Sequence, residues 1–453
     1  MMIRLSRKKK FGLIIFFITI ALFWNLIALL LCNFFSIAPK LVEKEKILEE
    51  SYPYANSNVT FLIGVSELIP KKNKTACSKF RGYPALSLIF KKLPLNFSSI
   101  ESEMEEVFFK VTGKRVSQAK LVYLYKGGIK SVKIGNELIV HAIEIAGNES
   151  KYDFYLGTYD SGYLLGGLLN QGKIKYEIID QVDKRIREME VGDVDGDNSN
   201  EILVATHYDG ITAIYYPKQN WKREIIDKGR YGENNTYNHK VEVGDINGDG
   251  INDIVSVLSQ PNSWDKVQRG VIKLFVREGN TWKSYETKEL ERSSVRKVVL
   301  YPQEQAIFGG VGQRDEPEPR DASIIKYQFV NNSLRQVKET FFREARHNLY
   351  PFLVKGKKRD ILVALSSNGL AFGIDPKTMK KIFEYTFSNK FEAFYTADVL
   401  DYDLDGNEDM IIVHDGKLSV FAVSTAGLRE IKSIKVYKNF ESVIVWSVRG
   451  LRK

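Results

Sequence analysis

The distribution of apolar residues separates an N-terminal segment from the rest of the chain. Residues 11–32 form an apolar run that contains one amide, Asn25, and no charged side chain. At about 1.5 Å of rise per residue, a helix over this run would be about 33 Å long, which is enough to cross the hydrocarbon core of a bilayer. The pattern therefore predicts an N-terminal transmembrane helix. Beyond it, apolar residues occur in short β-type runs without helical periodicity.

Three later segments repeat one arrangement of polar and apolar positions. They begin at Val191 (VGDVDGDNSNEILVAT), Val243 (VGDINGDGINDIVSVL) and Leu400 (LDYDLDGNEDMIIVHD). Counted from its first carboxylate, each has an acid or amide at positions 1, 3 and 5, an acid at position 9, and then an apolar run. The three loops start at residues 193, 245 and 401, so the second spacing is three times the first. Two degenerate copies are therefore expected between the second and third loops.

Weaker copies of the apolar run occur at this spacing. They begin at Asp360 and, more loosely, at Ala306, and upstream at Asp153 and, more weakly, at Glu106. Around the second loop the strands are expected at residues 240–244, 253–258, 270–277 and 282–288. Units of about fifty residues with four strands each are typical of propeller blades. The sequence thus predicts an all-β fold, a β-propeller of about seven blades, following the N-terminal transmembrane helix.

A propeller must close into a ring, and the chain offers a strand for this purpose. Residues 441–448 (ESVIVWSV) follow the last repeat and are expected to close the first blade, whose outer strands come from about 100–135. The predicted organisation is a cytoplasmic tail at 1–10, the membrane helix at 11–32, a linker at 33–57 and an extracytoplasmic propeller at 58–453. Residues 51–100 are open to three interpretations: an additional blade, a cap, or packing around the membrane anchor.

The net charge of +10 at first suggests binding to nucleic acid or an anionic surface. Six of the 66 basic residues lie within residues 1–40, which contain no acid, so the remaining chain is close to neutral. We therefore expect no nucleic-acid partner. The basic residues before the helix, Arg4, Arg7 and Lys8 to Lys10, orient it with the N-terminus in the cytoplasm. The expected location is the cell membrane, crossed once, with the propeller outside.

A cleavable signal peptide is the competing interpretation of the N-terminus. Its apolar region would span only about 7–15 residues, and the candidate cleavage site at Ala38 is followed by an unfavourable Pro39. A lipid anchor at Cys32 is excluded because Leu31 precedes it in place of a small residue. An uncleaved anchor is therefore favoured. The chain has two cysteines, Cys32 at the membrane and Cys77 beyond it, which exclude a disulfide scaffold.

Asn-x-Ser/Thr triplets agree with an external location. Each is a possible N-glycosylation site in a surface loop. They occur at Asn58, Asn73, Asn96, Asn148, Asn234 and Asn331.

The acidic loops are candidate metal sites. Several carboxylates within nine residues repel one another unless a cation lies among them, and side-chain oxygens at alternate positions suit a hard cation with six to eight ligands. This favours Ca²⁺ over Mg²⁺, and the absence of His and Cys from the loops disfavours zinc and copper. A helical EF-hand is excluded, because position 12 holds Val204, Ser256 or Ile412 instead of Glu. A solvated Asp-rich turn would explain one loop, whereas three at one repeat phase favour metal binding.

The motif Asp-x-Asp/Asn-x-Asp-Gly-x-x-Asp before an apolar strand resembles the calcium loop of the FG-GAP/VCBS repeat family, found in integrin alpha-subunit propellers. The resemblance implies about three structural Ca²⁺ sites in loops that join the first and second strands of a blade. Their ligands would be side chains at positions 1, 3, 5 and 9 and the main-chain carbonyl of position 7: Asp193, Asp195, Asp197, Ser199 and Glu201; Asp245, Asn247, Asp249, Ile251 and Asp253; Asp401, Asp403, Asp405, Asn407 and Asp409.

The chain departs from the family pattern at a few positions. Asn198 stands where glycine is usual, Glu201 closes the first loop, and Leu404 replaces the glycine of position 4 in the third. The Phe-Gly and Gly-Ala-Pro motifs are missing except for Phe308-Gly309. Family membership is therefore better supported than an integrin-like ligand.

No catalytic motif emerges from the sequence, and we expect a protein that is not an enzyme. His207 and His414 follow second strands at corresponding places, but neither has a nucleophile motif nearby. Two long polar loops, residues 259–270 and 312–321, are candidates for recognition, with Trp264 and Arg314 as anchors. The favoured function is a membrane-anchored, calcium-stabilised module that binds a surface protein or a glycan. The alternatives are a carbohydrate-active enzyme and an accessory subunit of a cell-envelope complex.

Overall fold

The structure is a computed structural model. It describes residues 59–69, 115–125, 128–134, 140–147, 150–159, 161–170, 173–182, 185–232, 235–260, 269–290, 294–312, 322–345, 349–366, 368–387, 397–414, 416–436 and 443–452. The chain divides into two compact units. Apart from Ile69 and Arg115, the described residues belong to the unit formed by Lys46–Leu68 and Val116–Lys453.

Within these residues, the strands form seven sheets of four antiparallel strands each. From the innermost strand outwards, the sheets are β28 (Val443–Arg452), β1 (Val59–Ile69), β2 (Arg115–Tyr125), β3 (Gly128–Lys133); β4 (Val140–Ile145), β5 (Phe154–Thr158), β6 (Tyr163–Asn170), β7 (Lys173–Gln181); β8 (Ile186–Gly192), β9 (Glu201–Thr206), β10 (Thr212–Tyr216), β11 (Lys222–Asp227); β12 (Tyr237–Gly244), β13 (Asp253–Ser259), β14 (Gly270–Glu278), β15 (Thr281–Glu286); β16 (Ser294–Tyr301), β17 (Ala306–Gly312), β18 (Ala322–Phe329), β19 (Leu334–Phe342); β20 (Leu349–Val354), β21 (Ile361–Ser366), β22 (Leu370–Ile374), β23 (Lys381–Thr386); β24 (Ala397–Leu400), β25 (Asp409–His414), β26 (Lys417–Ser424) and β27 (Gly427–Lys435). Two short 3-10 helices, Pro217–Gln219 and Pro302–Glu304, complete the described elements.

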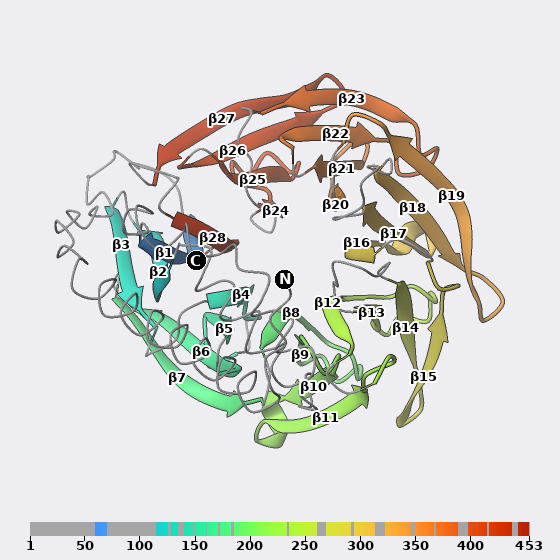
Figure 1. The fold of residues 1–453 in the computed structure, drawn as a ribbon, viewed down its shortest axis with the longest axis horizontal. Coiled ribbons are helices and arrows are strands. Elements are labelled where there is room, and N and C mark those ends of the chain that lie inside the picture. The colour runs from blue at the N-terminus through green and yellow to red at the C-terminus, as the bar shows by residue number, and fades with distance from the viewer. Residues whose placement is uncertain are drawn as a thin grey trace, which may run out of the picture. The chain divides into compact units, whose positions relative to one another are not determined.

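The seven sheets are the blades of a β-propeller. Their innermost strands surround the axis of the ring and their fourth strands form the rim (Figure 1). The region along this axis, between the innermost strands, is called the channel. Each innermost strand contacts that of the next blade, and β28 lies between β24 and β4. Because β28 also pairs with β1, from Val59 opposite Arg452 to Glu67 opposite Val443, one blade combines both ends of the unit. The prediction of a seven-bladed all-β propeller is confirmed.

Burial follows from the stacking of blades on one another. Second strands have neighbours on both faces, so every residue of β9 and β13 is buried, whereas the rim strand β11 is largely exposed or half-buried. The apolar core is shared between adjacent blades. At the ring closure, for example, Phe61 and Ile63 of β1 pack with Ile411 and Val413 of β25. Such contacts make the unit one closed ring of interlocked sheets.

The predicted repeat phase agrees with the observed second strands. Strands β9, β13 and β25 begin at the acids of position 9 in the three loops. Of the weaker copies, the one at Ala306 coincides with the start of β17, and those at Asp153 and Asp360 lie one residue before β5 and β21. The first blade differs from the expectation. Its second strand is β1, at Val59–Ile69, whereas the weak copy at Glu106 lies outside the described residues. Part of the segment that had three interpretations thus contributes a strand to this blade.

The N-terminal predictions concern residues that the structure does not describe. The tail at 1–10, the membrane helix at 11–32 and the linker at 33–57 all lie outside the described residues. Among the residues that are described, no helix has the length and apolar character needed to span a bilayer. The membrane anchor stays a prediction from sequence.

Candidate functional site

The three acidic loops occupy equivalent places in three blades. They join β8 to β9, β12 to β13, and β24 to β25, which are the first and second strands of each blade. Four antiparallel strands return the chain to its starting side, so every first strand runs in the same direction. All connections from a first to a second strand therefore lie on one face, which we call the acidic-loop face.

The backbone of the three loops has the same conformation at positions 4 and 6. Both positions have positive φ in every loop, including the two where the expected glycine is replaced. The left-handed region disfavours side chains other than Asn and Asp, so Leu404 is strained while Asn198 is tolerated. The φ values are 79° and 63° at Gly196 and Asn198, 82° and 88° at Gly248 and Gly250, and 63° and 82° at Leu404 and Gly406.

Hydrogen bonds from the main chain fix the first carboxylate of each loop. The amide of position 6 donates to it in all three: Asn198 to Asp193 at 2.8 Å, Gly250 to Asp245 at 2.9 Å, and Gly406 to Asp401 at 3.0 Å. The carboxylate of position 5 accepts in the same way from the amide of position 7, at 2.7 to 2.8 Å. The loop therefore curls around its own acidic side chains.

The structure gathers part of the predicted ligand set. Carboxylate oxygens of Asp193, Asp195 and Asp197 lie within 4.8 Å of one another, and those of Asp401, Asp403 and Asp409 do the same. In the second loop, the Asn247 amide instead donates to Asp249 at 2.8 Å. Carboxylates this close repel one another in the absence of a cation. The first and third loops thus present a three-carboxylate cluster. The second loop has the same backbone with an amide, Asn247, at position 3.

The acid at position 9 is the most buried acid of each loop. Burial raises the pKa of Glu201 and Asp253 to about 7 and that of Asp409 to about 6, and the other loop acids raise it further. Each also accepts a main-chain hydrogen bond, from Val194, Ile246 and Tyr402 respectively, which opposes the shift. A bound cation would favour the ionised form of these carboxyls.

These oxygen donors fit a hard divalent cation such as Ca²⁺. The side chains at positions 1, 3, 5 and 9 would hold it, with the carbonyl oxygens of Ser199, Ile251 and Asn407 as further ligands. The loop is braced against β-strands at both ends, so an ion there would tie a first strand to a second strand.

The opposite face carries longer connections. Three of them join the second and third strands of a blade: residues 70–114, 260–269 and 313–321. Between described strands of the acidic-loop face, no connection exceeds eight residues. We call the opposite side the long-loop face. The predicted anchors Trp264 and Arg314 fall in the sequence of the second and third of these connections and lie outside the described residues.

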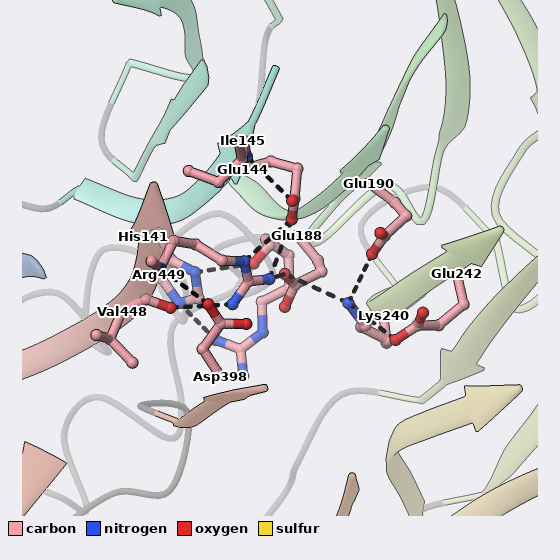
Figure 2. Close-up of polar contacts among 12 residues, drawn as sticks. His141, Glu144, Ile145, Glu188, Glu190, Lys240, Glu242, Asp398, Val448 and Arg449 are labelled. Carbon is pink, nitrogen blue, oxygen red and sulfur yellow. Dashed lines mark hydrogen bonds and ion pairs between the residues drawn. The ribbon is translucent and has the colours of Figure 1, made fainter. Parts of the chain in front are cut away.

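Buried charges line the channel between the two faces (Figure 2). The ammonium of Lys240 lies 3.1 Å from Glu242, 3.3 Å from Glu190 and 3.6 Å from Glu188. Burial opposes the charge of Lys240, but these carboxylates outweigh it and raise the pKa of Lys240. The network links β8 with β12 across a blade boundary.

A second ion pair extends this network to the closing strand. The guanidinium of Arg449 lies 3.1 Å from Glu144 and 3.7 Å from Glu188, and the Gly450 amide donates to Asp398 at 2.9 Å. Strands from five blades thereby share one set of charges. Sequence reasoning missed these residues, although charged residues at alternate positions of IREMEVG and of HKVEVG are a visible signal of a polar strand face.

The remaining sequence candidates are placed as follows. His207 directly follows β9 and stacks on Tyr237, whereas His414 ends β25 and lies 3.0 Å from Ser419 Oγ. Of the six possible glycosylation sites, Asn331 is described, and it is exposed in the turn between β18 and β19. Asn58, Asn73, Asn96, Asn148 and Asn234 lie outside the described residues.

Comparisons with known proteins agree with the repeat and the fold. A family model of FG-GAP-like repeats matches residues 193–256, which include the first two acidic loops. No curated protein matches the chain. The crystal structure of Sqt1 from Chaetomium thermophilum is similar, with 11% identity over 70% of this chain and 80% of that one and a TM-score of 0.50. A chain from a mitotic checkpoint complex has 8% identity over 66% and 81%, with a TM-score of 0.44. At 11% identity, the similarity to Sqt1 bears on the fold alone.

Proposed function

Because this chain is a seven-bladed β-propeller with FG-GAP-like repeats, we propose that it is a membrane-anchored, calcium-stabilised module that binds a surface protein or a glycan. In this proposal the long-loop face makes the contact. The acidic-loop face holds structural calcium ions.

The difference between the two faces is the observation that carries the proposal. Connections on the acidic-loop face are short, and the acidic loops are bonded to their own side chains, whereas three connections between second and third strands contain more residues: 70–114, 260–269 and 313–321. Long polar loops on a rigid scaffold are the usual carriers of recognition. The closed ring supplies that rigid scaffold, because every blade packs on two neighbours.

Calcium has a structural role in this proposal. Each acidic loop ends on a second strand, such as buried β9 or β13, and strand β13 separates the second acidic loop from the connection at 260–269. An ion in each would neutralise clustered carboxylates and hold two strands together. Its removal should lower stability without abolishing a chemical step.

Membrane attachment rests on the sequence of residues 1–32. The apolar run at 11–32 and the basic residues before it support one crossing with the propeller outside the cytoplasm. Protease added to intact cells should then degrade the propeller while a cytoplasmic marker survives. Survival of the propeller until the membrane is permeabilised would contradict this topology.

The recognition proposal is tested by crosslinking on intact cells with loop variants. In one variant, residues 261–268 and 313–321 are replaced by Gly/Ser sequences of equal length. The control replaces residues 355–360, which join β20 to β21 on the acidic-loop face. The long-loop variant should lose a specific crosslinked species that the wild type and the control both retain. Equal crosslinking by all three proteins would contradict the proposed binding face.

A further inference from the structure

Four neighbouring innermost strands share a β-bulge at the same level of the channel. In β4, β8, β12 and β16, the pairing with the second strand shifts by one residue. A bulge places one extra residue on its strand and redirects the side chains around it. The extra residues are His141, Arg187, His239 and Arg296, and all four are buried.

The bulges place consecutive side chains in one cavity. In a regular strand, successive side chains point to opposite faces. Here both members of three adjacent pairs line the same cavity of about 30 Å³, together with His141, Tyr350, Ser447 and Arg449. The pairs are Arg187 with Glu188, His239 with Lys240, and Arg296 with Lys297. We call this space the bulge cavity.

Basic groups dominate the lining of the bulge cavity. Five of its lining side chains are Lys or Arg, against one carboxylate, that of Glu188. Lys240 and Arg449 face the glutamates described above. Arg187 and Arg296 add two positive charges to a small space, and Lys297 adds a third when it is protonated.

Imidazoles hold the guanidiniums in position. Arg187 donates to Nε2 of His141 at 2.6 Å, and Arg296 approaches Nε2 of His239 at 3.1 Å. The other nitrogen of His141 donates to the carbonyl oxygen of Arg187 at 2.9 Å, which fixes the ring. Burial, followed by the charges of nearby arginines, lowers the pKa of both histidines well below the usual range. A neutral imidazole orients a guanidinium by accepting its hydrogen bond but does not neutralise the positive charge of the guanidinium.

A fourth arginine and a third histidine lie beside the cavity on the long-loop side. Arg185 also donates to His141 Nε2, at 2.8 Å, and lies 3.9 Å above the ring of Tyr159. His207 lies 5.6 Å from His239, and its buried Nδ1 has no hydrogen-bond partner among the described residues. This nitrogen is a second polar group, independent of the arginines, that a ligand or its water could satisfy.

From this geometry we infer that the bulge cavity binds a small oxyanion, of the class of phosphate or sulfate, between Arg187, Arg296 and Lys297. Guanidiniums present a planar fork of donors that matches the oxygens of such anions, and burial strengthens the attraction. One water needs about 10–15 Å³ of such space, so about 30 Å³ admits a ligand of only a few atoms. The inference does not depend on calcium or on a surface partner.

The test is titration calorimetry and thermal unfolding of the full chain with sodium phosphate, sulfate, acetate and chloride at constant ionic strength. Phosphate or sulfate should bind saturably and raise Tm more than chloride does. The variant R187Q should bind at least about tenfold more weakly, because it loses a charge-assisted hydrogen bond. R429Q, at an exposed position of β27, is the matched control and should bind as the wild type does.

Lys297 provides a second variant in case R187Q does not fold. Lys297 is half-buried, whereas Arg187 is buried, so its replacement should disturb the fold less. K297Q should retain the fold by circular dichroism and weaken the same anion. The inference is overturned if all four salts raise Tm equally. It is also overturned if the folded wild type shows no saturable binding, or if K297Q binds as tightly as R429Q.

Discussion

The two faces of the propeller differ in the length of their connections, and the short connections of one face include the three acidic loops. On the acidic-loop face, Asp193, Asp245 and Asp401 are each held by the amide of position 6. On the long-loop face, the connections at 70–114, 260–269 and 313–321 are longer than any on the other side between described strands. One face thus has short connections that fasten strands, whereas the other has long connections between its strands.

The channel repeats this contrast along its axis. Glu144, Glu190 and Glu242 lie near the ends of innermost strands that lead into the acidic-loop face. The bulges at Arg187 and Arg296 lie near the beginnings of such strands, towards the long-loop face. In the channel, as in the loops, acidic side chains therefore lie towards the acidic-loop face, whereas the buried arginines lie towards the long-loop face. This arrangement suggests that charge is part of the division of roles between the faces.

Calcium removal should have the largest effect on this contrast. At a calcium concentration one hundred times Kd, each loaded site adds about 2.7 kcal/mol to the free energy of unfolding. Thermal unfolding in calcium and in chelator measures the difference. An unchanged Tm would contradict the role assigned to the acidic-loop face, and magnesium serves as the control cation.

Loss of the Lys240 charge should follow in size. The variant K240M leaves Glu188, Glu190 and Glu242 without their shared cation in a buried place. Removal of one partner from a buried ion network costs about 3–5 kcal/mol. Urea unfolding measures the cost, and K432M on the rim strand β27 is the control. A loss below about 1 kcal/mol would show that the channel network does not brace the blades.

A single loop variant should remove the contribution of one calcium site. In D249A, position 5 of the second loop loses its carboxylate, so stability in calcium should fall by up to about 2.7 kcal/mol. In chelator, the wild type and D249A should differ little. The variant E430A, on an exposed part of β27, should change neither condition. Equal destabilisation of D249A with and without calcium would argue that Asp249 shapes the loop without binding an ion.

Binding of sulfate, whose charge is constant over this range, in the bulge cavity should weaken as pH rises through 7. Burial, followed by the positive charges of Lys240 and Arg449, lowers the pKa of Lys297 to about 7. The carboxylates of Glu242 and Glu188 act in the opposite direction. A bound anion favours protonated Lys297, so affinity should be about tenfold higher at pH 6 than at pH 8, or about 1.4 kcal/mol. His141 and His239 stay neutral over this range. Calorimetry at both pH values should show that K297Q loses the dependence.

Backbone strain in the acidic loops should give the smallest effects, with opposite signs at two positions. The variant G250A adds a side chain at φ of 88° with no atom within 4 Å of its Cβ, so about 1 kcal/mol of stability should be lost. The variant L404G relieves a left-handed residue that is 65% exposed, and it should gain up to about 1 kcal/mol. Chemical denaturation compares the two. A loss in L404G would mean that its side chain contributes to the loop.

The sequence predicted most of the blades because each second strand repeats one phase. Glu201, Asp253 and Asp409 mark the starts of such strands, and the weaker copies follow at the same spacing. Strand β1 was not predicted, because residues 70–114 separate it from β2 and no acidic loop precedes it. A single repeat unit carries no information about so long an insertion.

The candidate site was predictable only where chemistry is local in the chain. Nine consecutive residues define each acidic loop. The pair of Arg449 and Glu144, by contrast, joins strands at opposite ends of the chain. The bulges at His141 and His239 depend on a one-residue slip against the neighbouring strand, which a periodic pattern does not reveal.

Hydrogen exchange of the full chain, followed by mass spectrometry in calcium and in chelator, tests the difference between the faces most directly. Calcium should slow exchange in residues 193–201, 245–253 and 401–409 and in the strands that they join. Exchange in residues 260–269 and 313–321 should stay the same. Equal protection of both faces, or protection confined to the long-loop face, would contradict the account.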